Sequence, residues 1–141
     1  MNLDNFSKAF GSLVKNDSSW LEINDNFSIL VGRLSVESQS YNARASDWTK
    51  EHKDIVTSTM FDDLISTKKT DDTVSFTANV LMIDWKLKDN DGKEIPFTPE
   101  QAVEILNHPV LGTPLFIKVS QYAMIGENFN ADWEEKIVKN S

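Results

Sequence analysis

The sequence predicts an α+β fold that is mostly α, with amphipathic helices packed on a small N-terminal β-hairpin. Three observations lead to this prediction. Apolar residues recur at helical spacing along most of the chain, two β-prone runs flank one polar turn, and capping or turn residues separate the segments. The chain has 141 residues, of which 40% are hydrophobic and 26% charged. This length and composition predict a single domain over residues 1–141.

The first residues are expected to form a helix and the hairpin. Residues 1–16 predict an N-terminal helix, because their apolar side chains share one helical face. Residues 18–34 contain two β-prone runs separated by Asn24, Asp25 and Asn26, whose residue types favour turns. Two strands alone are marginally stable, so we expect helices to cover one face of the hairpin.

Residues 36–141 are expected to form the helical part. Ser35 is the expected N-cap of a polar helix, and a loop with a short helix is expected between Ile55 and Leu64. From Asp71 to Trp85 the spacing predicts one helix with a core-facing stripe. The stripe consists of Val74, Ala78, Leu81, Met82 and Trp85.

Two further helix starts have a cap followed by proline. Thr98 and Pro99 fit the N-cap and first helical position, and Thr113 and Pro114 repeat that pattern. The last helical stretch then continues toward the C-terminus, with Gly126 as the expected kink or break.

The composition argues against several classes of function. The formal net charge is −8 and the pI is about 4.7, so the surface should repel nucleic-acid phosphates. The chain has no cysteine, which excludes disulfides and thiolate zinc sites. The N-terminus lacks the pattern of a signal peptide, and no apolar run is long enough to span a membrane. We therefore expect a protein of the cytoplasm, without a membrane or nucleic-acid partner.

The span from Trp85 to Glu100 resembles a calcium loop at first sight, because it contains acidic residues and Gly92. An EF-hand loop needs oxygen ligands at positions 1, 3 and 5, glycine at 6 and glutamate at 12. With Gly92 at position 6, Leu87 and Thr98 occupy the two ends, and starting from Asp89 puts Glu94 at position 6. Both registers fail, so we interpret the span as a turn and a connector to the next helix.

No catalytic constellation is visible in the sequence. The sequence has two histidines, His108 before a proline at a helix end and His52 on a polar helix beside charges. We expect each to be a surface cap or a partner of a backbone carbonyl and not a catalytic group. The glycine-rich phosphate loops and the nucleophile elbow are missing. The sequence therefore predicts a non-enzymatic protein that needs no cofactor and no metal.

Three motifs lie in the C-terminal 60 residues or so. They are Trp85-Lys86, the run from Asp89 to Glu100 with its Asp-Gly turn and Pro-Phe-Thr-x-Glu helix start, and the acidic ending that closes in Lys139-Asn140-Ser141. This pattern resembles that of small tail-assembly proteins of long-tailed bacteriophages. It implies a tail assembly chaperone, which binds the tape measure protein, helps recruit tail tube subunits, and is absent from the mature virion. Such proteins act in the cytoplasm of the host bacterium, and we expect this one to self-associate.

The expected partner-binding face lies in the last helical stretch. Four aromatic or aliphatic residues share that face: Tyr122, Phe129, Trp133 and Ile137. The alternative for these residues is that they only close the core. Two other functions stay open, a structural virion component such as a head–tail joining or minor tail protein, and a small hydrolase or metal-dependent enzyme.

Overall fold

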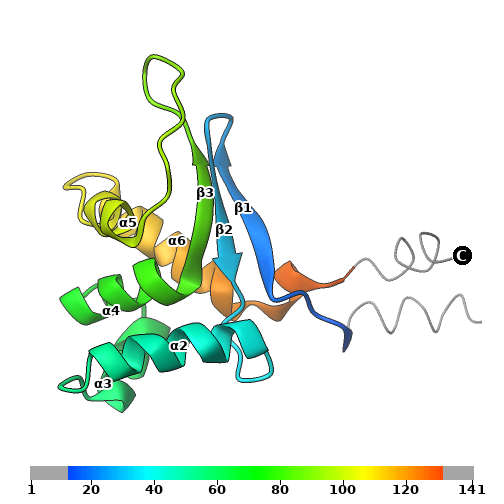
Figure 1. Ribbon diagram of the computed structural model, residues 1–141, viewed down its shortest axis with the longest axis vertical. Coiled ribbons are helices and arrows are strands. Elements are labelled where there is room, and N and C mark those ends of the chain that lie inside the picture. Colours follow the sequence, from blue (N-terminus) through cyan, green and yellow to red (C-terminus); the bar gives the residue numbers. More distant parts are fainter. Residues whose placement is uncertain (1–12, 132–141) are drawn as a thin grey trace, which may run out of the picture.

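The computed structural model describes residues 13–131 and has one three-stranded antiparallel sheet with helices on one side of it (Figure 1). The strands are β1 (Ser18–Asn24), β2 (Phe27–Gly32) and β3 (Met82–Leu87), in the order β1-β2-β3. The α-helices are α2 (Gln39–Glu51), α3 (Thr57–Ile65), α4 (Asp71–Phe76), α5 (Pro99–Leu106) and α6 (Gly112–Met124). A π-helix, η1 (Thr77–Leu81), follows α4, and a 3-10 helix, η2 (Gly126–Phe129), follows α6. The predicted α+β class, mostly helical, is confirmed.

The predicted hairpin is present as β1 and β2. Residue pairs run from Ser18 opposite Gly32 to Asn24 opposite Phe27, and the turn between the strands is two residues long. Asn24 Oδ1 accepts a hydrogen bond from the Asn26 amide at 2.8 Å, so an asparagine closes the turn through its side chain. Leu21, Ile29 and Val31 are buried on the face that the helices cover. Most of the N-terminal helix predicted over residues 1–16 lies outside the described residues.

The helix predicted from Asp71 to Trp85 is wrong in its last turn, because Met82 to Trp85 belong to a strand. The chain is helical through α4 and η1, and then becomes β3 without any intervening loop. The side chains of the expected stripe from Val74 to Trp85 are all buried. However, the first three belong to the helical segment and the last two to β3, where side chains alternate between two faces. In Met82–Leu87 the Asp84 and Lys86 side chains are exposed while Trp85 is buried, which is strand alternation. The predicted helical part, residues 36–141, therefore contains the third strand.

The junction between helix and strand is held by Arg44 from α2. Its Nε donates to the Val80 carbonyl oxygen at 2.8 Å, inside the π-helix, where backbone hydrogen bonding departs from the regular α pattern. The guanidinium also fills the space beside Gly32, where an added Cβ would come within 2.2 Å of Arg44 Nη2. Burial lowers the pKa of Arg44, whereas the charges of Asp17 and Tyr41 act in the opposite direction. One side chain thus joins α2, β2 and η1.

Two of the predicted helix starts differ from those observed. The Thr98 cap of α5 is confirmed, since its Oγ1 accepts from the Gln101 amide at 3.1 Å with Pro99 at the first turn. Helix α2 begins after Ser38 rather than after Ser35, and the Ser38 hydroxyl accepts from the Tyr41 amide. Helix α6 begins at Gly112, so Thr113 lies inside its first turn instead of capping it. The predicted break at Gly126 is confirmed, because α6 ends at Met124.

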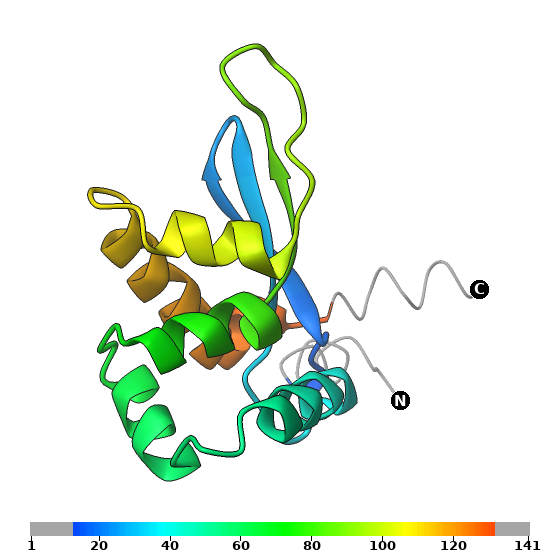
Figure 2. The same cartoon turned by 60° about the vertical axis from the view of Figure 1, so that its left-hand side comes forward.

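The core lies between the sheet and the helices and extends into the layer formed by α2, α3 and α4. Phe76 contacts three aromatic rings edge to face, those of Tyr41, Trp48 and Phe61, at centroid distances of 6.5, 5.2 and 5.3 Å. The hairpin turn and the β3–α5 connector project from the same end of the molecule, as both views show (Figures 1 and 2). Within the described residues, no helix is long and apolar enough to cross a bilayer.

Candidate functional site

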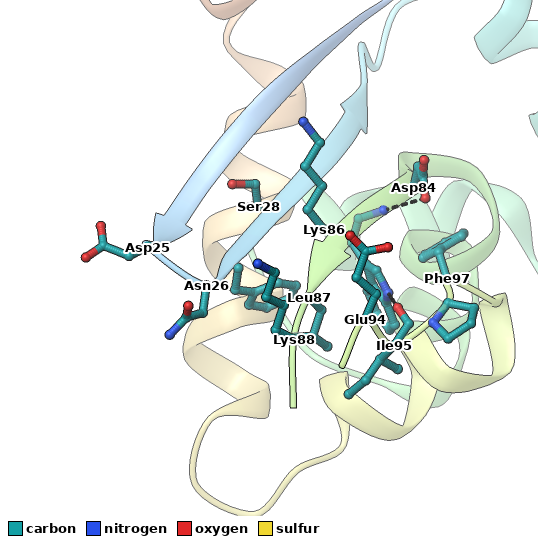
Figure 3. A pocket seen from close by; sticks show the side chains of 13 residues that line it. Asp25, Asn26, Ser28, Asp84, Lys86, Leu87, Lys88, Glu94, Ile95 and Phe97 are labelled. Carbon is teal, nitrogen blue, oxygen red and sulfur yellow. Dashed lines mark hydrogen bonds between the residues drawn. The ribbon is translucent and has the colours of Figure 1, made fainter. Parts of the chain in front are cut away.

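A large hollow lies beside β3, near the hairpin turn. We call it the edge trough; its volume is about 730 Å³ (Figure 3). It is bounded by the adjacent ends of β2 and β3 and by the segment that leads to α5. The lining residues are Asp25 to Ser28, Asp84 to Lys88 and Glu94 to Phe97.

The trough exists because β3 is an edge strand that is only partly covered. After β3 the chain turns back, and the Ile95 amide donates to the Leu87 carbonyl oxygen at 2.8 Å. Lys88 and Glu94 form an isolated antiparallel bridge there. Pro96 follows and has no N–H group to continue the pairing. The segment therefore leaves β3 after this short contact, and the trough opens where the two diverge.

Aromatic rings form the rigid wall of the edge trough. Trp85 is 5% exposed, and its ring meets Phe97 and Phe27 edge to face at centroid distances of 5.0 and 6.0 Å. The Trp85 Nε1–H donates to the Ile95 carbonyl oxygen at 2.8 Å, which ties the β3–α5 segment to the sheet. The wall is therefore formed before any partner binds.

The rim carries charges of both signs: the carboxylates of Asp25, Asp84 and Glu94 and the ammonium groups of Lys86 and Lys88. Asp84 Oδ1 accepts from the Trp85 amide at 2.8 Å, so this carboxylate satisfies an N–H of the strand itself. Lys86 Nζ lies 4.7 Å from the centroid of the Trp20 ring, a cation–π contact on the sheet. An aromatic wall with a mixed-charge rim suits a segment of polypeptide that has both apolar and charged side chains.

The residues that line the trough do not form a catalytic arrangement. They include no histidine, and the one hydroxyl, that of Ser28, has no general base bonded to it. In the part of the chain that the structure describes, no three His, Asp or Glu side chains gather in a way that could hold a metal ion.

The connector interpretation of the Asp-Gly span is confirmed. Asp89 Oδ1 accepts from the amides of Asp91 and Lys93 at 2.8 and 2.9 Å, so the carboxylate closes the turn. Gly92 adopts a φ of +79°, which glycine tolerates better than other residues. Asp89, which starts one of the two candidate calcium registers, therefore stabilises the loop that leads to one side of the trough.

Both histidines bond to backbone at helix ends. His52 Nδ1 is 2.8 Å from the Trp48 carbonyl oxygen, and its ring stacks on the Trp48 indole at 4.5 Å. His108 Nδ1 accepts from the amides of Val110 and Leu111, both at 3.1 Å, and so shapes the α5–α6 turn. These are the structural roles that the sequence predicts for the two side chains.

The predicted partner-binding face is described only in part. Phe129 is fully buried, and its ring lies 5.6 Å from that of Tyr122. The Tyr122 hydroxyl is 2.8 Å from Ser19 Oγ and donates to the Trp20 carbonyl oxygen at 3.2 Å. These two residues therefore connect α6 and η2 to β1. Trp133 and Ile137 lie outside the described residues, and partner binding by the four stays a prediction.

The sequence does not reveal the edge trough, although it contains two signals of it. Met82–Leu87 alternates between buried and exposed side chains, but its apolar residues also fit the helical stripe that begins at Val74. Pro96 after an isoleucine indicates an extended segment that cannot stay in a sheet. The position of that segment next to β3 depends on long-range packing.

Residues 36–140 match the family model described as YdaY prophage protein. The matched range covers β3 and the Glu94–Phe97 side of the trough, while the hairpin side precedes it. No curated protein and no solved structure shows significant similarity to the chain.

Proposed function

We propose that this chain, which belongs to the YdaY prophage protein family, is a tail assembly chaperone of a long-tailed phage. In this proposal it binds the tape measure protein and helps recruit tail tube subunits, without catalysing a reaction. It acts in the cytoplasm of the host bacterium and leaves before the virion is complete. The resemblance of the segment from Trp85 to Glu100 to phage tail-assembly proteins supports this finer assignment.

The observation that carries the proposal is the edge trough. A chaperone must hold a polypeptide segment reversibly, through apolar contacts and exposed backbone groups. The trough offers the Trp85 and Phe97 rings beside a partly unpaired strand edge. An extended segment can add to such an edge and place alternate side chains against the aromatic wall. The net charge of −8 supports solubility while the client is held.

The experiment is co-expression with the tape measure protein encoded by the same prophage. We expect the tape measure protein to be soluble and to co-purify when this chain is present, and to aggregate when it is absent. Mass spectrometry of purified tails should find the tape measure protein but not this chain. If this chain is present in particles at a fixed ratio to tail subunits, it is a structural virion component and the proposal is wrong.

A pair of variants locates the contact. The trough variant combines Glu94→Lys with Pro96→Lys, two exposed positions on the trough rim. The control combines Glu51→Lys with Val56→Lys, two exposed positions at the end of α2 and just before α3. Both should keep the melting temperature of the parent, and only the trough variant should lose the tape measure protein. Equal retention by both variants would exclude the trough as the client site.

A further inference from the structure

A second surface, which we call the apolar groove, lies on the other side of Phe27 from the edge trough. It consists of two adjoining hollows of about 320 and 260 Å³, which share Asn24, Phe27, Ile105 and Leu111 as lining residues. The first hollow also contains Lys88, and the second contains Lys118. The groove thus runs between the hairpin turn and the start of α6.

The walls of the groove are apolar and are held in place by local bonds. Ile105 projects from α5, and Leu111 from the α5–α6 turn, where it remains 62% exposed. His108 Nδ1 fixes that turn by accepting from the amides of Val110 and Leu111. Val110, beside it, is 73% exposed. Large apolar side chains in a fixed, exposed turn are typical of a surface that a partner covers.

The charges of the groove are opposite to those of the protein as a whole. The chain has 22 acidic and 14 basic residues, yet the lining of both hollows contains no carboxylate. Its charged side chains are Lys88 in one hollow and Lys118 in the other, and both are exposed. A cationic, apolar surface on an acidic protein favours a ligand that is apolar and carries negative charge.

The size of the hollows indicates what kind of ligand fits. A pocket for a drug-sized molecule encloses most of its ligand. Two open hollows of 320 and 260 Å³ instead suit two apolar side chains of one peptide segment. Two lysines are too few to hold an anionic membrane surface against the net charge of −8.

We propose that the apolar groove binds an acidic, amphipathic segment of a partner protein. Two apolar side chains of the segment enter the hollows, and its carboxylates pair with Lys88 and Lys118. This inference does not depend on the proposed chaperone function. Lys88 and Phe27 line both surfaces, but Ile105, Leu111 and Lys118 line only the groove. It requires a partner segment with acidic residues next to large apolar ones.

The test uses a random 12-residue peptide library, selected on the whole protein at low salt. We expect the enriched peptides to combine two large apolar residues with at least two acidic ones. A synthetic peptide of the enriched sequence is then titrated by fluorescence anisotropy. Enriched peptides that are basic, or that lack apolar residues, would overturn the proposal.

Two variants and two controls place the peptide in the groove. Lys118→Glu and Leu111→Asp change residues that do not line the edge trough, and each should weaken binding at least tenfold. Lys53→Glu and Val56→Asp make the same changes at exposed positions elsewhere and should leave binding unchanged. Unaltered binding by both groove variants, with the fold intact by circular dichroism, would also overturn the proposal.

Sedimentation of the same variants separates this partner from a second copy of the chain. The proposal predicts that Leu111→Asp leaves the oligomeric state of the protein unchanged. If that substitution alone converts an oligomer into monomers, the groove is filled by another copy and the proposal is wrong.

Discussion

Strand β2 has two neighbours, and the chain reaches them in very different ways. It is connected to β1 by a two-residue turn, while α2, α3, α4 and η1 lie between β2 and β3. The pairing with β1 depends on local residue choice, above all the asparagines at the turn. The pairing with β3 depends on packing between helices far apart in sequence. The edge trough lies on the β3 side, so the candidate site depends on that non-local pairing.

The largest effect should come from Phe76→Ala, which removes the ring at the centre of the aromatic cluster in the helical connection. Phe76 is 1% exposed, and replacing a buried phenylalanine by alanine lowers the free energy of unfolding by about 3–5 kcal/mol. Urea denaturation measures this loss. Ile65→Ala, at an exposed position in α3, is the control and should have little effect.

Hydrogen exchange on the Phe76→Ala variant tests the contrast between the two pairings. We expect β3 amides to lose more protection than β1 amides, since the substitution weakens the connection that holds β3. Equal loss in the two strands would show that the sheet opens as one unit and would contradict the contrast.

Arg44→Met should have the next largest effect. It removes the donor to the Val80 carbonyl oxygen in η1, and a buried carbonyl left without its partner costs about 1–3 kcal/mol. Lys50→Met is the matched control, because Lys50 is an exposed cation on the same helix. Thermal unfolding of the two variants compares them, and equal melting temperatures would mean that Arg44 does not hold the junction.

Thr98→Ala should cost about 1 kcal/mol, because it removes the side-chain acceptor for the Gln101 amide at the start of α5. This position anchors the end of the segment that borders the edge trough. Thr98→Ser keeps the hydroxyl and should restore most of the lost stability in urea denaturation. A serine variant as unstable as the alanine variant would show that the hydroxyl is not the cause.

Tyr122→Phe tests the β1 side, where the tyrosine hydroxyl bonds to Ser19 and to the Trp20 backbone. Loss of these bonds should cost about 0.5–1.5 kcal/mol in urea denaturation. Hydrogen exchange should rise in β1 and remain unchanged in β3. An increase in hydrogen exchange confined to β3 would show that Tyr122 does not stabilise β1.

The smallest effect concerns pH. Burial raises the pKa of Tyr41 in the folded protein, and the nearby Arg44 only partly offsets this. The unfolded tyrosine titrates near pH 10, so the unfolded state loses its proton first. Stability should therefore fall as pH rises above about 10, and Tyr41→Phe should reduce that fall. Urea denaturation at pH 9 and 11 measures the difference, and identical slopes for the two proteins would rule out this contribution.

The sequence predicts those parts of the fold that depend on neighbouring residues. The hairpin, the Thr98 cap, the Asp89 turn and the break at Gly126 follow from local residue types, and the structure confirms each. The switch from η1 to β3 could not be predicted in the same way. Its apolar residues satisfy helical and strand spacing at once, and packing against β2 decides between them.

The candidate site is less predictable than the fold. The edge trough needs Trp85 and Ile95 to come together across the connector, and only the three-dimensional structure shows their hydrogen bond. The apolar groove likewise combines the hairpin turn with α5 and α6. The apolar spacing that includes Phe129 indicates burial correctly, but it does not distinguish a core residue from a partner contact.

The long connection between β2 and β3 also delays the completion of the sheet while the protein is being synthesised. About 50 residues separate Gly32 from Met82, and ribosomes add roughly 5–20 residues per second. A hairpin closes within about 1–10 μs once its strands are free. During synthesis, β2 therefore waits for roughly 3–10 s with one edge unpaired. During this interval the unpaired edge of β2 can pair with another chain.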